Sequence, residues 1–399
     1  MRLDLFLISC LTLFLELTCI RWFPSHVLFL TFFTNTVLLA SILGISVGCL
    51  AAKRKSNLLL WTPLILVIGL GSAHLVEWQR QVSAGVIDVG NQASPQMVYF
   101  GVEYQARDLS SFVIPIEVLC GYFFLVIALA MMGPGQQLGR CLAAIPNRLE
   151  AYTIDILGSI AGIVIFAACS FLELPPTWWF AIVMAGFVWF LTAGDRRRGL
   201  ALALGPALVL ALSIAPQGTR GDSPRQMWSP YYRIDYHPSN RIINVNLIGH
   251  QQMQPRDAAF PAYALPHLLN RDAGGKPFGQ VAIIGAGSGN DVSRALAWGA
   301  ERVDAVEIDP VIQRLGKRDH PDHPYDDPRV FVHLNDGRNF LKAGNKQYDL
   351  IVYALVDSLV LHSGYSNIRL ESYLFTKQAM DDVRKRLRPG GVFVMYNYF

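Results

Sequence analysis

Long apolar stretches separated by short polar turns fill the first 215 residues, and this pattern stops there. Several stretches approach the roughly 20 residues that a helix needs to cross a bilayer. The predicted spans are 3–20, 27–51, 58–76, 112–133, 152–172, 177–193 and 200–215. The pattern therefore predicts a multi-span α-helical membrane domain over residues 1–215, with six or seven helices.

A polar linker, 216–228, separates this region from a different pattern. Two extended runs, 231–236 and 241–247, flank His237-Pro-Ser-Asn240 and predict a β-hairpin. We assign this hairpin to a small β-rich subdomain over residues 229–278.

From residue 279 to residue 399, strand and helix patterns alternate. Strands are predicted at 280–284, 302–307, 330–333, 348–353 and 392–396, and helices at 291–298, 311–316, 338–343 and 371–387. Such alternation predicts an α/β Rossmann-like domain, a parallel sheet with helices on both faces. Ligands of these sheets bind at the carboxyl ends of the strands.

Charge divides the chain in the same way. Residues 1–215 carry 12 Lys and Arg and 11 Asp and Glu, whereas the other 184 residues carry 22 and 19. A single soluble domain and a disordered chain are both excluded, because only the second part has an ordinary charge content. The net charge of +4 is spread without a basic stripe, so no nucleic-acid partner is expected. All six cysteines lie in the first part, where they are interpreted as small apolar residues.

Loop charges predict the orientation of the spans. Basic residues follow the second, fourth and sixth spans, at 53–55, at 140 and 148, and at 196–198. Six spans with the N-terminus inside obey the positive-inside rule. A full seventh crossing at 200–215 would put the second part outside. We expect a multi-pass protein of a bacterial-type inner membrane with its soluble domain in the cytoplasm, where nucleoside donors are made.

The first predicted strand of the Rossmann-like domain ends in a glycine-rich turn. Gly285, Gly287 and Gly289 form a GxGxG run in which backbone can approach a ligand closely. Asn290 stands where a dinucleotide fingerprint has glycine, which favours an adenosylmethionine-type ligand over NAD. The run alone is a weak signal.

Polar residues follow the next three strands as well. Glu307 lies 22 residues past the first glycine, near the spacing expected of an acid that accepts hydrogen bonds from ribose hydroxyls. Asp336 and Gly337 follow the third strand, where a carboxylate suits an adenine amino group, and Asp357 follows the fourth. Four consecutive strand ends therefore predict one nucleoside site.

These motifs together resemble the spermidine synthase family, specifically its membrane-fused bacterial members, which share the fold of class I methyltransferases. Besides the glycine run, the resemblance rests on Val306-Glu-Ile-Asp309, Asp327-Pro-Arg-Val330, Asn335-Asp-Gly337 and Tyr348-Asp-Leu-Ile-Val352. It implies decarboxylated S-adenosylmethionine as co-substrate and an amine as aminopropyl acceptor. It also implies that Gln252, in the β-rich subdomain, contacts the nucleoside.

The sequence departs from the family where the amine would be handled. Ser288 replaces an aspartate of the glycine loop, and Ala354 replaces the aspartate that helps to deprotonate the amine. Tyr263 is followed by Ala264 and Leu265, where the family has His-Glu. Asp357 remains as the predicted catalytic residue, which would orient or deprotonate the acceptor.

Three functions remain open at this point. The first is aminopropyl transfer, the second is methyl transfer from S-adenosylmethionine to a membrane-associated acceptor, and the third is non-enzymatic polyamine or nucleoside sensing or transport. The expected partners are the lipid bilayer and a small amine, with a homo-oligomer left open. No metal is expected, because the prolines around His320-Pro-Asp-His323 impose an extended loop, no HExxH helix is present, and the resemblance places this segment in an ordinary connection. The last strand is expected to lack the antiparallel hairpin that ends the family's sheet, so the domain is expected to be truncated.

Overall fold

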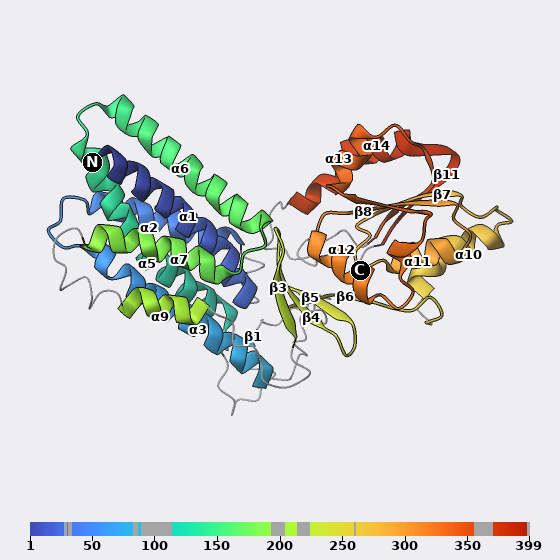
Figure 1. The fold of residues 1–399 in the computed structure, drawn as a ribbon, viewed down its shortest axis with the longest axis horizontal. Coiled ribbons are helices and arrows are strands. Elements are labelled where there is room, and N and C mark those ends of the chain that lie inside the picture. Colours follow the sequence, from blue (N-terminus) through green and yellow to red (C-terminus); the bar gives the residue numbers. More distant parts are fainter. Residues whose placement is uncertain are drawn as a thin grey trace. The chain divides into compact units, whose positions relative to one another are not determined.

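The computed structural model describes residues 1–27, 30, 34–82, 87–88, 114–192, 204–213, 224–258, 261–354 and 370–396. They form two compact units (Figure 1). Unit 1 comprises Met1–Ile234 and Val245–Ile248, and unit 2 comprises Asp235–Asn244 and Gly249–Phe399. Each unit is described by itself below.

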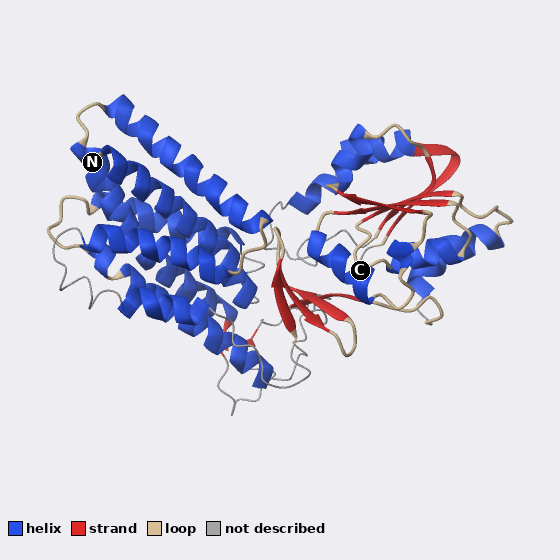
Figure 2. Cartoon of the chain, in the orientation of Figure 1, coloured by secondary structure: helices blue, strands red, loops and turns tan. Residues whose placement is uncertain are grey.

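Unit 1 is built mainly from helices that follow the predicted apolar stretches (Figure 2). The helices are α1 (Arg2–His26), α2 (Thr34–Leu50), α3 (Thr62–Val82), α5 (Ile116–Ala144), α6 (Arg148–Phe171), α7 (Pro176–Thr192) and α9 (Leu204–Ser213). Within the described residues, four helical segments are long and apolar enough to cross a membrane, namely Arg2–His26, Leu58–Trp78, Val118–Ala144 and Arg148–Phe171. The segments Asn35–Leu50 and Pro176–Leu191 are apolar but shorter.

Small residues let these helices approach each other closely. An added Cβ at Gly44 or Gly48 of α2 would collide with backbone carbonyls of α5. The same holds for Gly158 and Gly162 of α6 against carbonyls of α1. The two small-xxx-small motifs of the sequence therefore serve intramolecular helix packing.

Basic residues gather at one end of these helices. Arg140, near the end of α5, donates hydrogen bonds to the carbonyls of Ala52, Arg54 and Ser56 in the turn after α2. Arg2, at the start of α1, pairs with Glu150 at the start of α6. The end of α1 contacts a different part of the chain, because Arg21 donates to the Ser229 carbonyl and Arg233 donates to that of Ser25. Residues 228–233 therefore lie at the end of unit 1 opposite to the basic turns.

A four-stranded sheet follows, in the order β3-β4-β5-β6. Its strands are β3 (Arg225–Trp228), β4 (Arg233–His237), β5 (Ile242–Val245) and β6 (Ile248–Gln252). Strands β4 and β5 are neighbours, as the predicted hairpin requires, and the turn between them has Arg241 at a φ of 53°.

The Rossmann-like sheet of unit 2 has the order β11-β10-β7-β8-β9 and is parallel throughout. Its strands are β7 (Gln280–Ile284), β8 (Arg302–Glu307), β9 (Val330–Leu334), β10 (Tyr348–Tyr353) and β11 (Leu387–Met395), and its helices are α10 (Leu265–Asp272), α11 (Asn290–Ala297), α12 (Pro310–Asp319), α13 (Gly337–Ala343) and α14 (Lys377–Arg386). The predicted parallel sheet is confirmed. The first strand in sequence, β7, occupies the centre, and the chain winds outward from it in both directions.

Alternating residues of the buried strands form two cores. Val281 and Ile283 of β7 pack on the side of α11, and Ala282 and Ile284 pack on the side of α13 and α14. Figure 1 shows α11 and α13 on opposite faces of the sheet. Successive side chains of a strand point to opposite faces of the sheet. A strand that helices cover on both faces therefore needs apolar side chains on both.

One predicted helix is wrong in its extent. The sequence predicts a helix over 371–387, whereas the structure has a 3-10 segment at Leu370–Phe375 followed by α14. The break occurs at Thr376, whose side chain accepts a hydrogen bond from the Ala379 amide and caps α14. Strand β11 then begins at Leu387, earlier than predicted.

Asp304 on β8 is fully buried and is surrounded by cationic and hydroxyl donors. Arg302 and His333 lie 3.0 and 2.8 Å from its carboxylate, Lys346 lies 3.4 Å away and the Tyr348 hydroxyl 3.3 Å. Burial by itself would raise the pKa of Asp304, but the hydrogen bonds from Arg302 and His333 and the charges of Lys346 and Arg302 together outweigh it, so the pKa lies below its ordinary value.

We expect Asp304 to make unit 2 sensitive to acid. A carboxyl with a lowered pKa in the folded state stabilises the protein above pH ~4, and this contribution is lost as the pH falls through the folded-state pKa. Asp304→Ala should cost about 2 kcal/mol, less than the ~3–5 kcal/mol of a fully buried pair because the partners are partly exposed. In the wild type, the protection of the β8 amides from hydrogen exchange should fall steeply as the pH is lowered from 6 to 3. In Asp304→Asn this fall should disappear. An unchanged fall would contradict this assignment.

Candidate nucleoside site

The glycine loop after β7 has a backbone that other residues rarely adopt. Gly285, Gly287 and Gly289 have φ angles of 77°, 56° and 105°. An added Cβ at Gly287 would lie 2.7 Å from Oε1 of Gln251, and one at Gly289 would lie 2.8 Å from Cγ of Pro324. The positive φ angles favour glycine at all three positions, and at Gly289 the ring of Pro324 also leaves no room for a Cβ. The loop then leads into α11, so the first N–H groups of α11 lie near the carboxyl end of β7.

Glu307, at the end of β8, holds the glycine loop in place. Its Oε2 accepts a hydrogen bond of 2.7 Å from the Gly287 amide, and its Oε1 accepts one of 2.8 Å from the Asp309 amide. Burial raises the pKa of Glu307 to about 7, against the lowering effect of these two amide bonds. Each carboxylate oxygen can accept a further hydrogen bond, which is what a pair of ribose hydroxyls would supply.

Asp336 and Gly337 lie at the end of the adjacent strand. Asp336 is exposed and caps α13 by accepting a 2.8 Å hydrogen bond from the Asn339 amide. Gly337 is buried, and an added Cβ there would collide with the side chain of Ile284 at the end of β7. Because β7, β8 and β9 are parallel neighbours, the glycine loop, Glu307 and Asp336 share one edge of the sheet.

The structure places a different glutamine at the loop from the one predicted. Gln251 Oε1 accepts a 2.7 Å hydrogen bond from the Ser288 amide, whereas Gln252 is exposed and donates to the Asn240 carbonyl. Successive side chains of a strand point to opposite faces, so a displacement of one residue reverses the side chain's direction. The structure therefore brings the side chain of Gln251 to the glycine loop, while the nucleoside contact of Gln252 stays a prediction.

We expect Gln251 and Gln252 to differ in their effect on ligand binding. Gln251→Ala removes the acceptor of the Ser288 amide and should weaken nucleoside binding about five- to ten-fold, the range of one or two neutral hydrogen bonds. Gln252→Ala should change affinity less than two-fold. Calorimetric titration of both variants with S-adenosylmethionine-type nucleosides measures the difference. The opposite order would favour the predicted contact of Gln252 instead.

The structure describes only part of the region where the sequence predicts an acceptor. Asp357, the predicted catalytic residue, lies outside the described residues. Ala354 follows β10, with its amide bonded to the Ile284 carbonyl, so a methyl group stands where the family has an aspartate. Asp291 is buried at the start of α11, and burial raises its pKa to about 7 against a hydrogen bond with Tyr396.

Three further residues whose hydrogen bonds support the loop or its neighbours were not predicted in these roles. The buried Tyr325 hydroxyl donates a 2.6 Å hydrogen bond to the Gly287 carbonyl. Asn290 connects the loop to the β-rich subdomain, since its Nδ2 donates to the Gln252 carbonyl and to the Tyr263 hydroxyl. His320 bonds to Asn290 and to the Asp322 amide, so it has a structural role in this loop. Except for the bond between His320 and the Asp322 amide, these contacts join segments distant in sequence, so no local spacing indicates them.

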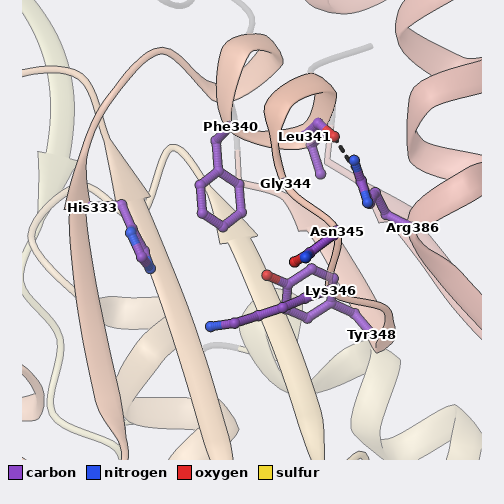
Figure 3. A pocket seen from close by; sticks show the side chains of 8 residues that line it. All are labelled: His333, Phe340, Leu341, Gly344, Asn345, Lys346, Tyr348 and Arg386. Carbon is purple, nitrogen blue, oxygen red and sulfur yellow. Dashed lines mark hydrogen bonds between the residues drawn. The ribbon is translucent and has the colours of Figure 1, made fainter.

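A cavity of about 140 Å³ lies elsewhere in unit 2 (Figure 3). Lys346 and Tyr348 line it at the beginning of β10, together with Phe340 of α13. Arg386 borders the cavity and donates to the Leu341 carbonyl, the bond drawn in Figure 3. Parallel-sheet ligands bind at the carboxyl ends of strands, so this hollow at an amino end is separate from the nucleoside site.

Comparison with known proteins finds similarity within unit 2. Residues 275–397 match the spermine/spermidine synthase domain. The spermidine synthase of Coffea arabica is 35% identical over 118 residues, 28% of this chain and 34% of that protein. The polyamine aminopropyltransferase of Korarchaeum cryptofilum is 30% identical over 30% of this chain and 35% of its own. The match thus spans about a third of the length of these relatives.

A third relative is putrescine N-methyltransferase 2 of Nicotiana attenuata, 34% identical over 28% of this chain and 29% of its own. The solved spermidine synthase of Thermotoga maritima aligns with 43% of this chain and 54% of its own at 19% identity, with a TM-score of 0.32, too low to carry an argument. The sheet and its glycine loop define unit 2 as a Rossmann-like domain with a candidate nucleoside site. Residues 275–397 are similar to the spermine/spermidine synthase domain and to spermidine synthases and polyamine aminopropyltransferases.

Proposed function

We propose that the chain is an integral-membrane transferase that binds decarboxylated S-adenosylmethionine and transfers its aminopropyl group to an amine. The observation that carries this proposal is the bond between Glu307 and the Gly287 amide, which fixes a ribose-binding carboxylate against the glycine loop. The family match over residues 275–397 supports the donor class.

In the proposed reaction the amine nitrogen attacks the aminopropyl carbon bound to the sulfonium. A C–N bond forms, the C–S bond breaks with its electron pair on sulfur, and the new ammonium group loses a proton. The nucleoside leaves as a neutral thioether. Orientation of the two reactants can supply much of the rate, which suits a site where Ala354 replaces a proton acceptor.

Membrane integration is part of the proposal. It is supported by the four helical segments of sufficient length and apolarity and by the glycine contacts that pack α2 on α5 and α6 on α1. The cytoplasmic placement of the soluble part remains a prediction from the chemistry of the donor.

Methyl transfer from S-adenosylmethionine is the second candidate function. It is favoured by the similarity to putrescine N-methyltransferase 2, together with the substitution of Ala354 at the acceptor side. Both reactions would use the same nucleoside-binding edge, and they differ in the group attached to sulfur.

Titration of the purified full chain with both nucleosides tests these functions. Preference for the decarboxylated donor, with an aminopropylated amine detected by mass spectrometry, supports the first reaction. Preference for S-adenosylmethionine with a methylated product supports the second. Binding of neither nucleoside would contradict both enzymatic functions and nucleoside sensing, and would leave polyamine sensing or transport.

We expect donor affinity to rise between pH 6 and pH 8. The pKa of Glu307 lies at about 7 without ligand, and only the ionised carboxylate accepts hydrogen bonds from two hydroxyls with both oxygens. Below this pKa, affinity should fall by up to about ten-fold per pH unit. Calorimetry at three pH values should show this slope in the wild type and lose it in Glu307→Gln. A flat profile in the wild type would exclude this role of the Glu307 charge.

A further inference from the structure

Two imidazoles and a carboxylate converge within unit 1, outside the nucleoside site. His26 is the last residue of α1, and His74 and Glu77 lie three residues apart on α3. One potential ligand atom of each residue lies within 4.8 Å of those of the other two. The spacing of three residues places His74 and Glu77 on the same face of their helix. Nothing in the glycine loop or in the proposed transfer reaction uses these side chains.

Backbone carbonyls fix the tautomer of both histidines. Nδ1 of His26 lies 2.9 Å from the Trp22 carbonyl, and Nε2 of His74 lies 2.6 Å from the Leu212 carbonyl. A carbonyl only accepts, so each of these nitrogens carries the proton. The lone pair then lies on Nε2 of His26 and on Nδ1 of His74. Histidines that bind metals in proteins almost always have this second hydrogen bond from the other ring nitrogen.

The carboxylate is fixed in a similar way. Arg233 donates a 2.7 Å hydrogen bond to Oε1 of Glu77 and a 3.0 Å hydrogen bond to the Ser25 carbonyl. The side chains of Arg233 and Glu77 are only 7% and 12% exposed. This arrangement orients the carboxylate and leaves Oε2 with its lone pairs. The arginine charge opposes a bound cation, so a reversibly filled site fits better than a permanently filled one.

Aromatic rings enclose the cluster. The Trp22 ring stacks on His26 with centroids 3.9 Å apart and meets His74 edge-on at 5.5 Å. Trp228 lies parallel to His26 at 6.4 Å. Trp22 and His26 are 0% and 3% exposed. An apolar wall around polar ligands lowers the local dielectric and strengthens binding of an ion that these ligands match.

We propose that His26, His74 and Glu77 form a binding site for a divalent transition-metal ion. Two imidazoles and one carboxylate are a ligand set that proteins use for Zn²⁺, with a further position open, and for Fe²⁺. Mg²⁺ and Ca²⁺ prefer oxygen ligands and fit this set poorly. Such a site would give the helical unit a ligand of its own, independent of the transferase reaction.

The test uses the full chain purified in detergent, stripped with a chelator and titrated with Zn²⁺. We expect about one equivalent of Zn²⁺ per chain, a higher midpoint of thermal unfolding with metal, and a d–d absorption band when Co²⁺ replaces Zn²⁺. Glu77→Gln keeps an acceptor for Arg233 but loses the charge, so it should bind Zn²⁺ at least ten-fold more weakly. His74→Gln should do the same.

His323→Ala is the matched control, since this exposed histidine belongs to the loop in unit 2 that also holds His320. It should leave Zn²⁺ binding unchanged. Less than a tenth of an equivalent in the wild type, or no Co²⁺ band, would overturn the proposal whatever the variants do. Equal Zn²⁺ affinity in the wild type and in Glu77→Gln would also overturn it. The wild-type Co²⁺ spectrum does not depend on whether a variant folds.

Discussion

Glu307→Ala is expected to abolish donor binding, lowering affinity at least about a hundred-fold. The substitution removes both acceptors that a ribose would use, and hydrogen bonds to a charged group are worth about 1.5–3 kcal/mol each. It also releases the Gly287 and Asp309 amides, which Glu307 holds at 2.7 and 2.8 Å. The loop would then lose part of its fixed geometry. Calorimetric titration with the decarboxylated and the carboxylated donor measures the loss.

Glu301→Ala is the control for this prediction, because Glu301 is exposed in the turn before β8. It should bind the donor within two-fold of the wild type. Glu307→Gln separates charge from structure, since an amide oxygen can still accept one backbone hydrogen bond. Affinity retained within two- or three-fold in Glu307→Ala would show that the nucleoside site lies elsewhere.

Gly44→Ala is expected to disrupt the packing of α2 on α5. The new Cβ would collide with the Ala128 carbonyl and lie 2.8 Å from Cβ of Met131. Neither helix can yield locally, because Gly48 and Gly135 make equally close contacts along the same pair. We expect a loss of about 1–3 kcal/mol, the range of overpacking in a filled core. Thermal unfolding of the chain in detergent measures it as a lower midpoint.

Gly121→Ala provides the matched comparison within the same pair of helices. Gly121 lies in α5, and an added Cβ there has nothing within 4 Å. Alanine favours a helix by up to about 1 kcal/mol over glycine, so this variant should be as stable as the wild type or more stable. If both variants unfolded at the same temperature, the α2–α5 contact would not be the close one described.

Pattern alone predicted most of the regular structure, for identifiable reasons. Strands β7, β8 and β10 match the predicted ranges residue for residue, because each is a mostly buried run of five or six residues with the length of an ordinary strand. The helix predicted over 371–387 failed because Thr376 is a cap inside an otherwise helical pattern. Periodicity over a long window does not register a single capping hydrogen bond.

The site was predictable where the backbone itself requires particular residues. The three glycines with positive φ and the acid at the end of the next strand could be recognised from residue type and spacing alone. Gln251 was missed because strand β6 carries two adjacent glutamines, and only the register of the sheet distinguishes their faces. The His26, His74 and Glu77 cluster joins α1 to α3, and no spacing within one segment indicates it.

The contrast in charge between the two ends of unit 1 connects membrane orientation to metabolism. If the basic end with Arg2 and Arg140 faces the cytoplasm, as the charge rule requires, residues 228–233 lie on the far side of the membrane. The nucleoside-binding domain that follows them in the chain would then fold outside the cytoplasm. Its donor would have to be exported, and its product would add to an external polyamine pool instead of the cytoplasmic one. A reporter fused after Phe399 and active only outside the cytoplasm would place the candidate nucleoside site on that side of the membrane, whereas one active only inside would make the basic end an exception to the charge rule.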